Sequence, residues 1–150
     1  MKIFSQDLIK LNYYALDKKS CLREMVELLA EQGVVVDNGL FLNAILEREK
    51  LMSTGIGRGI AIPHARGKVV AQFKIAIYLL ENKLDFDSID GEPVSVIFMI
   101  AVPDNMKEEY IRVLSLISNF CKDQQKVEKL FNAGNALEVY EMMQRIEDEI

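Results

Sequence analysis

The chain has 150 residues, of which 50% are hydrophobic and 27% are charged, with a formal net charge of −5 and a pI near 5.0. This composition is typical of a folded protein with a substantial core and excludes a disordered chain. The Lys and Arg residues form no dense run, so we expect no nucleic-acid partner. The length predicts a single domain over residues 1–150.

No targeting or membrane segment is evident. The beginning of the chain lacks the apolar stretch of a secretion signal. The longest apolar run, Val94 to Val102, is interrupted by Ser95 and has about half the length that a membrane helix needs. Cys21 and Cys121 lie far apart without a CxxC motif or a histidine cluster, which indicates neither disulfides nor a metal site. We expect a cytoplasmic protein that does not insert into a membrane.

Two helices are predicted near the beginning of the chain. Ser20 can cap the first, whose apolar residues recur at helical spacing until Gly33 ends it. The second is expected from about Gly39 to Lys50. The residues predicted to face inward are Leu22, Met25, Val26 and Leu29 in the first helix, and Leu40, Ile45 and Leu46 in the second.

The middle of the chain reads as strands. Residues 53–66 form a loop, a short strand and another loop. Phe73 to Leu80 is a predicted strand with two apolar faces, which is typical of a sheet covered on both sides. After a polar connection, Leu84 to Pro93, comes the most hydrophobic strand candidate, Val94 to Val102, which we expect at the centre of the sheet.

The last third of the chain is predicted to be helical. One apolar stripe extends over several turns after Pro103, and shorter helices follow at about Asp123 to Asn132 and Ala136 to Glu147. The stripe consists of Tyr110, Val113, Leu114, Ile117, Phe120 and Cys121. Helices before and after a block of strands fit a layered α/β domain.

The only histidine, His64, lies where phosphoryl chemistry is plausible. It follows Pro63, which cannot continue a sheet ladder and so predicts an accessible strand end. A neutral imidazole nitrogen is a competent nucleophile near neutral pH. Arg58 and Arg66, on either side, could bind phosphoryl oxygens. A purely structural histidine is the alternative that these residues leave open.

Three glycines, Gly55, Gly57 and Gly59, alternate just before the short strand. Their spacing matches neither GxGxxG nor GxxxxGK[ST], which argues against a nucleotide site. Alternating glycines let a backbone approach another group and point its N–H groups at it, although a flexible loop is the simpler alternative. No Cys–His pair, GxSxG elbow or metal-spaced cluster suggests other catalytic chemistry.

The run from Ala44 to His64, which ends in Ser-Thr-Gly-Ile-Gly-Arg-Gly-Ile-Ala-Ile-Pro-His, resembles the IIA domains of the bacterial phosphotransferase system, fructose/mannitol class. The similarity continues through Leu84 to Val94 and the hydrophobic strand that ends at Pro103, so it covers most of the chain. It implies a single EIIA type-2 domain with a three-layer α/β/α fold. The implied sheet is mixed, has about five strands and carries helices on both faces.

The resemblance also implies a function. In this family the histidine matching His64 is phosphorylated by the carrier protein HPr or a paralogue, without a metal or cofactor. The group then passes to a cysteine of a IIB domain during sugar uptake, whereas regulatory members bind target proteins according to their phosphorylation state. Arg48 matches the family arginine that lies beside the phosphohistidine. The other candidate phosphoryl-binding residues of the run are Ser53, Thr54, Gly57 and Gly59.

One position departs from the family pattern. Family members usually carry a second histidine in a Glu-His-Leu pattern, where this chain has Glu109-Tyr110-Ile111. A tyrosine hydroxyl can donate a hydrogen bond but cannot become a cation near neutral pH. Tyr110 is either an accessory residue of the site or simply the first residue of the apolar stripe. The chain is accordingly a phosphocarrier or, alternatively, a IIA-like binding module with weak or no phosphotransfer.

If the chain is a phosphocarrier, it is either a sugar-specific IIA or a nitrogen-type regulatory IIA. A sugar-specific IIA needs a IIB and a membrane IIC partner, neither of which this sequence contains. Nitrogen-type members work as free-standing chains of about this length, which favours the regulatory branch. Sugar-system IIA proteins can also be separate chains, so both branches stay open.

Overall fold

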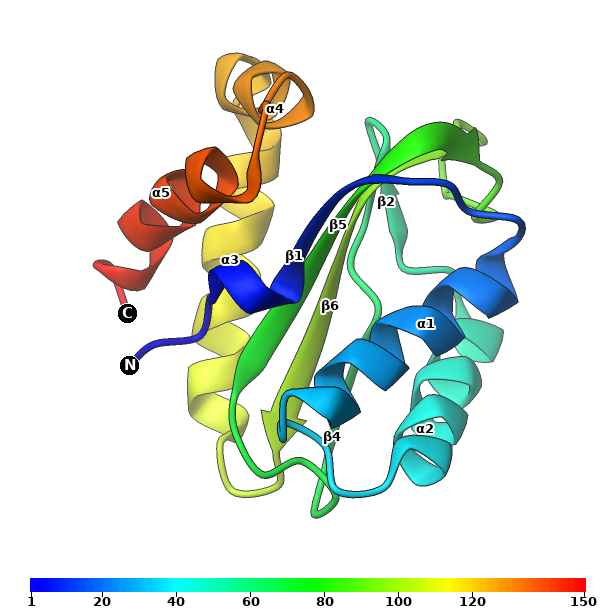
Figure 1. Cartoon of the computed structure of the whole chain (residues 1–150), viewed down its shortest axis with the longest axis vertical. Helices are drawn as coiled ribbons and strands as arrows, with labels where there is room; N and C mark the ends of the chain where they lie inside the picture. Colours follow the sequence, from blue (N-terminus) through cyan, green and yellow to red (C-terminus); the bar gives the residue numbers. More distant parts are fainter.

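Strand β6 (Val94–Pro103) lies inside a six-stranded mixed sheet, in the computed structural model that describes all 150 residues (Figure 1). The strand order is β1–β5–β6–β3–β2, and β4 also pairs with β6. The other strands are β1 (Ile9–Tyr13), β2 (Gly55–Gly57), β3 (Ile60–Ala61), β4 (His64–Gly67) and β5 (Lys74–Leu84). The helices are η1 (Gln6–Leu8), α1 (Lys18–Glu31), α2 (Asn38–Leu51), α3 (Lys107–Lys122), α4 (Gln124–Phe131) and α5 (Ala136–Glu147).

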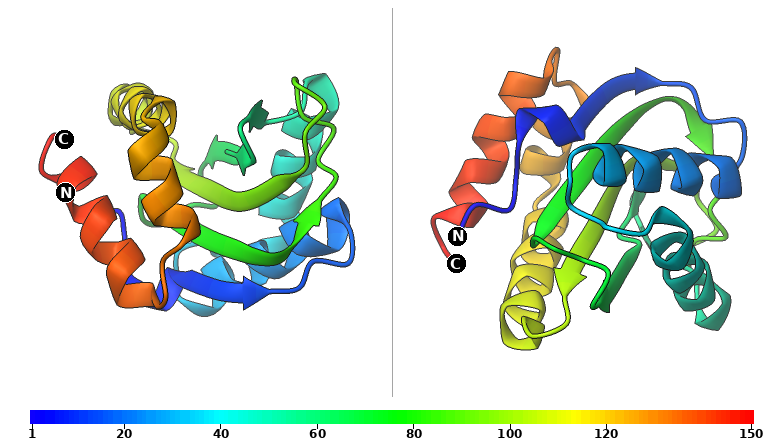
Figure 2. Two further views of the ribbon diagram at one scale, coloured as in Figure 1. Left: turned by 90° about the horizontal axis from the view of Figure 1, so that it is seen from above. Right: turned by 60° about the horizontal axis from the view of Figure 1, so that its bottom comes forward.

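Helices cover both faces of this sheet, with α1 and α2 on one side and α3, α4 and α5 on the other (Figures 1 and 2). The alternation along β6 explains why both faces are apolar. Phe98 and Ile100 belong to the core beneath α3 and α5, whereas Ile97 and Met99 belong to the core beneath α1 and α2. The predicted α/β/α layers, the central position of 94–102 and its two-sided burial are therefore confirmed.

The sheet has six strands, where about five were expected. The difference arises because two short strands, β3 and β4, pair one after the other with the same neighbour, β6. Both β3 and β4 run parallel to β6, with Ile60 opposite Val96 and His64 opposite Ile100. Pro63 lies between them and has no N–H to donate to a ladder. Its carbonyl accepts the Ile100 N–H at 2.9 Å, so the interrupted segment stays aligned with β6.

The first two helices begin slightly earlier than the sequence pattern predicts. Asp17, and not Ser20, caps α1, because its carboxylate accepts the Ser20 N–H at 2.7 Å. Asp37 caps α2 by accepting the Leu40 N–H at 3.0 Å. The prediction that Leu40 faces inward is wrong, since it is 57% exposed, and Phe41 fills the core in its place.

The two ends of the chain complete the core beneath α3 and α5. The sequence patterns above do not predict β1, which pairs in parallel with β5 at the edge of the sheet. Beside it, the Glu147 carboxylate of α5 accepts the N–H groups of Ile3 and Phe4, each at 2.8 Å, so the two termini lie close together (Figure 1). The predicted helices α3, α4 and α5 are present within a few residues of their expected bounds. No helix combines the length and the apolar character needed to cross a bilayer.

Candidate functional site

His64 is the first residue of β4 and is partly buried. Its Nδ1 lies 2.8 Å from the carbonyl oxygen of Ile62. Since a carbonyl can only accept, this contact places the proton on Nδ1 and leaves the lone pair of the neutral ring on Nε2. Burial lowers the pKa of His64; the Ile62 carbonyl opposes this shift, Arg48 adds to it and Glu49 opposes it. The imidazole is therefore a neutral nucleophile near pH 7.

The Ile62 carbonyl that orients the ring is held by neighbouring strands. The Ile62 N–H donates to the Thr54 carbonyl at 2.9 Å, which extends the β2–β3 pairing by one bond. On the other side of Pro63, the register of β4 against β6 is continuous from His64 onward. The local backbone, and not only side-chain packing, thus determines which ring nitrogen is free.

Arg48 approaches this site from the last turn of α2. Its Nη1 donates to the Met52 carbonyl at 2.7 Å, which satisfies an acceptor at the helix end. Helix α2 packs against β4, and the Arg48 charge acts on the pKa values of both His64 and Tyr110. The structure therefore places Arg48 within electrostatic range of His64 and Tyr110. Local spacing does not indicate Arg48, because it lies 16 positions before the histidine in the sequence.

Tyr110 lies against His64, with ring centroids 5.5 Å apart and planes inclined by 46°. It stands in the first turn of α3 and is partly buried against the core beneath that helix. Burial raises the pKa of the Tyr110 phenol, while Arg48 and Arg66 act in the opposite direction, so the hydroxyl stays protonated. Tyr110 thus begins the apolar stripe and is also adjacent to the histidine, so its position fits both alternatives.

The two arginines favoured by local spacing are engaged elsewhere. Arg58 donates from its guanidinium to the carbonyls of Cys121 and Lys122, at 3.4 and 3.1 Å, at the end of α3. The structure thus places the Arg58 guanidinium at the end of α3, and not beside His64 where the sequence suggested that it could bind phosphoryl oxygens. Arg66 lies two residues after His64 in β4 and donates to the Asp104 carbonyl at 2.6 Å, with the Asp104 carboxylate 3.6 Å away. Arg66 is thus bound to the turn before α3, and its charge acts on the pKa of Tyr110 beside the imidazole.

Ser53 and Thr54 form the connection from α2 into β2. The Ser53 hydroxyl donates to the Phe86 carbonyl at 2.6 Å and accepts the Gly55 N–H at 3.0 Å. Thr54 is only 3% exposed, and its hydroxyl donates to Glu49. Both side chains therefore shape the backbone next to the site, with their own hydroxyls already bonded.

Gly57 and Gly59 lie at the tip of the β2–β3 hairpin. Both have positive φ, +97° and +81°, in the region that glycine adopts without strain. Gly57 is paired with Ile60. Ile60 lies four residues before His64, a separation of about 13 Å in an extended chain. Their close approaches are to Asp90 and Phe131, so the structure does not bring these glycines to the imidazole.

Glu49 is a neighbour of the site that the sequence patterns do not reveal. Its side chain is 6% exposed, and its Oε1 accepts from Lys18 Nζ at 2.9 Å and from the Thr54 N–H at 3.1 Å. Local pattern could not single it out, because Glu47 and Lys50 beside it form an exposed pair on the same helix. Only the packing of α1 against α2 shows which of these charged residues is enclosed.

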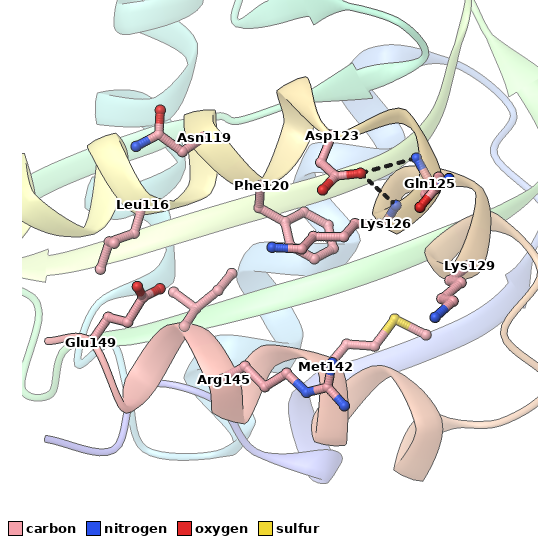
Figure 3. A pocket seen from close by; sticks show the side chains of 11 residues that line it. Leu116, Asn119, Phe120, Asp123, Gln125, Lys126, Lys129, Met142, Arg145 and Glu149 are labelled. Atoms are coloured by element: carbon pink, nitrogen blue, oxygen red, sulfur yellow. Dashed lines mark hydrogen bonds between the residues drawn. The ribbon is translucent and has the colours of Figure 1, made fainter.

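A groove of about 410 Å³ lies away from His64, between α3, α4 and α5 (Figure 3). Its floor includes Leu116, Phe120 and Met142, and its rim includes Lys129 and Arg145. None of the sequence-predicted site residues lines it. No three His, Cys, Asp or Glu side chains are grouped to hold a metal ion. The histidine site is therefore a partly open surface site at the edge of β4, separate from this groove.

Residues 2–146 match the family described as "Phosphoenolpyruvate-dependent sugar phosphotransferase system, EIIA 2". The chain belongs to this family. EIIA domains are the phosphocarriers of that system, and the resemblance read from the Ser53–His64 run is confirmed.

Relatives of two kinds share this EIIA region. The fructose-specific EIIA component of Haloferax volcanii is 31% identical, covering 93% of this chain and 91% of that protein. The nitrogen regulatory protein of Klebsiella oxytoca is 32% identical, covering 94% and 87%. The fructose-specific EIIABC component of Bacillus subtilis is 34% identical over 88% of this chain, which spans only 21% of that longer protein.

Solved structures show the same division. The nitrogen regulatory protein IIA-Ntr of Neisseria meningitidis has a TM-score of 0.89 at 33% identity, covering 94% of this chain and 96% of its own. The mannitol IIA of Escherichia coli has a TM-score of 0.79 at 25% identity, covering 95% and 99%. The EIIA fold is therefore common to both the sugar-specific and the regulatory branches, and this chain has it.

Proposed function

We propose that this EIIA chain is a phosphocarrier that accepts a phosphoryl group from HPr, or an HPr-like protein, on Nε2 of His64. The observation that carries the proposal is the 2.8 Å contact between His64 Nδ1 and the Ile62 carbonyl, which leaves Nε2 as the free nucleophile. In the transfer, the Nε2–phosphorus bond forms while the bond from phosphorus to the donor atom breaks, and the electron pair leaves with the donor. The step requires no metal or cofactor.

The same contact supports the return step. After transfer, the ring retains its proton on Nδ1 and carries a positive charge, which the Ile62 carbonyl stabilises by accepting that proton's hydrogen bond. When a thiolate or another acceptor attacks phosphorus, the ring can leave as a neutral imidazole. His64 is thus suited both to accept a phosphoryl group and to pass it on.

Arg48 is proposed to bind the phosphoryl oxygens. Its guanidinium is within electrostatic range of His64, and a planar fork of N–H donors suits phosphate oxygens. We expect Arg48→Ala to slow phosphorylation about tenfold or more while the fold survives, because the residue is partly exposed and holds only a helix-end carbonyl. Arg48→Lys should restore the charge without the fork and so recover only part of the rate.

The test is reconstitution with enzyme I, HPr and phosphoenolpyruvate, followed by intact mass measurement. We expect the wild-type chain to gain one acid-labile phosphoryl group and His64→Ala to gain none. Arg58→Ala is the matched control, because Arg58 binds the end of α3 and should not affect the transfer. No gain in mass with an HPr that phosphorylates a known EIIA would overturn the proposal.

Within this function we favour the nitrogen-type regulatory role over sugar transport. In support, the similarity to the Neisseria IIA-Ntr structure, at a TM-score of 0.89, exceeds that to the mannitol IIA, at 0.79. Gene context offers a direct test: a neighbouring nitrogen sigma-factor gene is expected, whereas adjacent IIB and IIC genes would indicate transport. Incubating the phosphorylated chain with IIB proteins should then leave the phosphoryl group on His64.

A binding module without turnover is the second candidate, and Tyr110 is the observation that favours it. The residue occupies the position next to His64 without being able to supply a positive charge. In that case the chain would bind its partner equally with and without enzyme I and phosphoenolpyruvate, and the mass experiment above would show no phosphorylation.

A further inference from the structure

Glu49 is an enclosed carboxylate whose place in the molecule the proposed chemistry does not use. Both of its oxygens are engaged: Oε1 accepts from Lys18 and from the Thr54 N–H, and Oε2 accepts from the Thr54 hydroxyl. Thr54 is only 3% exposed, so its hydroxyl and N–H depend on this carboxylate for their hydrogen bonds. Glu49 therefore determines where Thr54 can lie.

Thr54 in turn is connected to the imidazole by two consecutive hydrogen bonds. Its carbonyl accepts the Ile62 N–H at 2.9 Å, and the Ile62 carbonyl lies 2.8 Å from His64 Nδ1. A shift of Thr54 would displace the backbone of Ile62, and with it the Ile62 carbonyl, because β2 and β3 are short and share few other bonds. The ring could then turn or exchange its proton between Nδ1 and Nε2.

We propose that Glu49 is a positioning residue, which holds Nε2 of His64 as the free nucleophile through Thr54 and the Ile62 carbonyl. This inference rests on the proposed phosphocarrier function, and it adds a residue that touches neither the imidazole nor the phosphoryl group in that scheme. Two neighbouring residues of α2 thus have different roles: Arg48 binds the phosphoryl group, and Glu49 orients His64, which accepts it.

The alternative is that Glu49 merely joins α1 to α2 through its ion pair with Lys18. The two roles differ in their effect on the ring. The charged groups that act on the pKa of His64 are Arg48, which lowers it, and Glu49, which raises it, while the neutral Tyr110 lies against the ring. Loss of the Glu49 charge lowers the pKa of His64 in either role. A purely structural brace would, however, leave the tautomer of His64 and the rate of its phosphorylation unchanged as long as the protein is folded.

The experiment compares the wild type with Glu49→Gln, which keeps the size of the side chain but loses its charge and one acceptor oxygen. We expect phosphorylation by HPr to slow by about ten- to a hundredfold, since small displacements of a reacting group have effects of that size. Titration of His64 by NMR should show a lower pKa, and its ¹⁵N shifts should show less of the Nδ1–H tautomer. Glu47→Gln, an exposed residue of the same helix, is the matched control and should change none of these.

A wild-type rate and a wild-type tautomer in a folded Glu49→Gln would overturn the inference, whatever the pKa of His64. If that variant does not fold, Thr54→Val and Thr54→Ser replace it, because only serine retains the hydroxyl that Glu49 binds. Valine should then reproduce the loss and serine should not, and a valine variant that behaves as wild type would contradict the inference. The NMR readings need no phosphoryl transfer, so a chain that HPr cannot phosphorylate would defeat the proposed function while still deciding the role of Glu49.

Discussion

The chemistry of His64 depends on a small number of opposing influences. Burial and Arg48 disfavour the protonated ring, while the Ile62 carbonyl and Glu49 favour it. Because burial is the largest of these, the pKa of His64 lies below its ordinary value of 6.5. The unphosphorylated imidazole is therefore neutral and nucleophilic at physiological pH. The positive charge near it comes from Arg48 and not from a second histidine.

This balance predicts the pH dependence of phosphorylation. The rate should be constant around neutral pH and should fall on acidification as the ring protonates, with a midpoint below 6.5. Arg48→Ala should move the midpoint upward, because it removes a cation that disfavours protonation. Initial rates at constant HPr phosphorylation, compared with an NMR titration of His64, check both statements. A wild-type midpoint above 6.5 would contradict them.

The same shift affects stability, with the opposite sign to that of a histidine in an ion pair. The unfolded chain titrates near 6.5 and the folded chain at a lower pH, so between these values the unfolded state binds more protons. His64 consequently destabilises the fold as the pH falls through this window and has no such effect above it. Urea denaturation of the wild type and His64→Ala at pH 7 and at mildly acidic pH measures this contribution.

Tyr110 can be tested by removing its hydroxyl or by restoring the family histidine. If the hydroxyl donates to a phosphoryl oxygen, Tyr110→Phe should slow transfer by about ten- to a hundredfold, since a hydrogen bond to a charged group contributes about 1.5–3 kcal/mol. Tyr110→His should accelerate transfer, because it can supply a cation beside His64. Stopped-time phosphorylation assays measure both. Equal rates in all three proteins would reduce Tyr110 to a packing residue.

The β2–β3 hairpin and the connection that follows β5 form one packed unit, although more than 20 residues separate them. The Gly55 carbonyl accepts the Ile89 N–H at 3.2 Å, and the Asp90 carboxylate accepts the Arg58 N–H at 3.1 Å. Arg58 then continues to the end of α3 through two carbonyls. The alternating glycines therefore serve this packing, which explains their spacing without a bound phosphoryl group.

Gly55→Ala should be destabilising for this reason. A Cβ at Gly55 would lie 2.2 Å from the Ser88 hydroxyl and 3.0 Å from the Ser88 Cα, so the connection has to move. We expect a loss of about 1–3 kcal/mol in the free energy of unfolding, as in other overpacked sites. Gly67→Ala is the control, because a Cβ there meets nothing within 4 Å and it should change stability by less than about 0.5 kcal/mol. Urea titrations give both values, and equal stabilities would exclude the steric explanation.

The molecule as a whole depends on the two cores that the sheet separates. Phe98 and Tyr78 are fully buried on opposite faces of neighbouring strands, and no ion pair lies within either core. Hydrogen bonds also connect the two ends of the chain, because the Glu147 carboxylate of α5 accepts from the N–H groups of Ile3 and Phe4. The site at β4 is thus mounted on a sheet that is buried on both sides.

Phe98→Ala tests this arrangement. Truncating a fully buried phenylalanine should lower the free energy of unfolding by about 3–5 kcal/mol. Leu51→Ala, at a residue that is 82% exposed, should change it by less than about 0.5 kcal/mol. Denaturation followed by far-UV circular dichroism provides the comparison. A small effect at Phe98 would mean that the core beneath α3 relaxes around the cavity.

The sequence by itself determined the α/β/α class, the central hydrophobic strand, the helices and the family. These follow from periodicity, capping residues and a contiguous motif, each of which is local along the chain. It also singled out His64, because Pro63 and the glycine-rich run are its immediate neighbours. Its errors were equally local: Ser20 was an available cap, but Asp17 formed the bond, and Leu40 fitted a helical stripe that Phe41 actually occupies.

Only the tertiary structure decided which side chains surround the imidazole. Arg58 is close in sequence and remote in space, whereas Arg48 and Tyr110 approach from α2 and α3. Glu49 became visible only once α1, α2 and β2 were placed together. The physical reason is that sheet register and helix packing set contacts between distant residues. Local patterns describe which face of an element is apolar, but not which other element that face will meet.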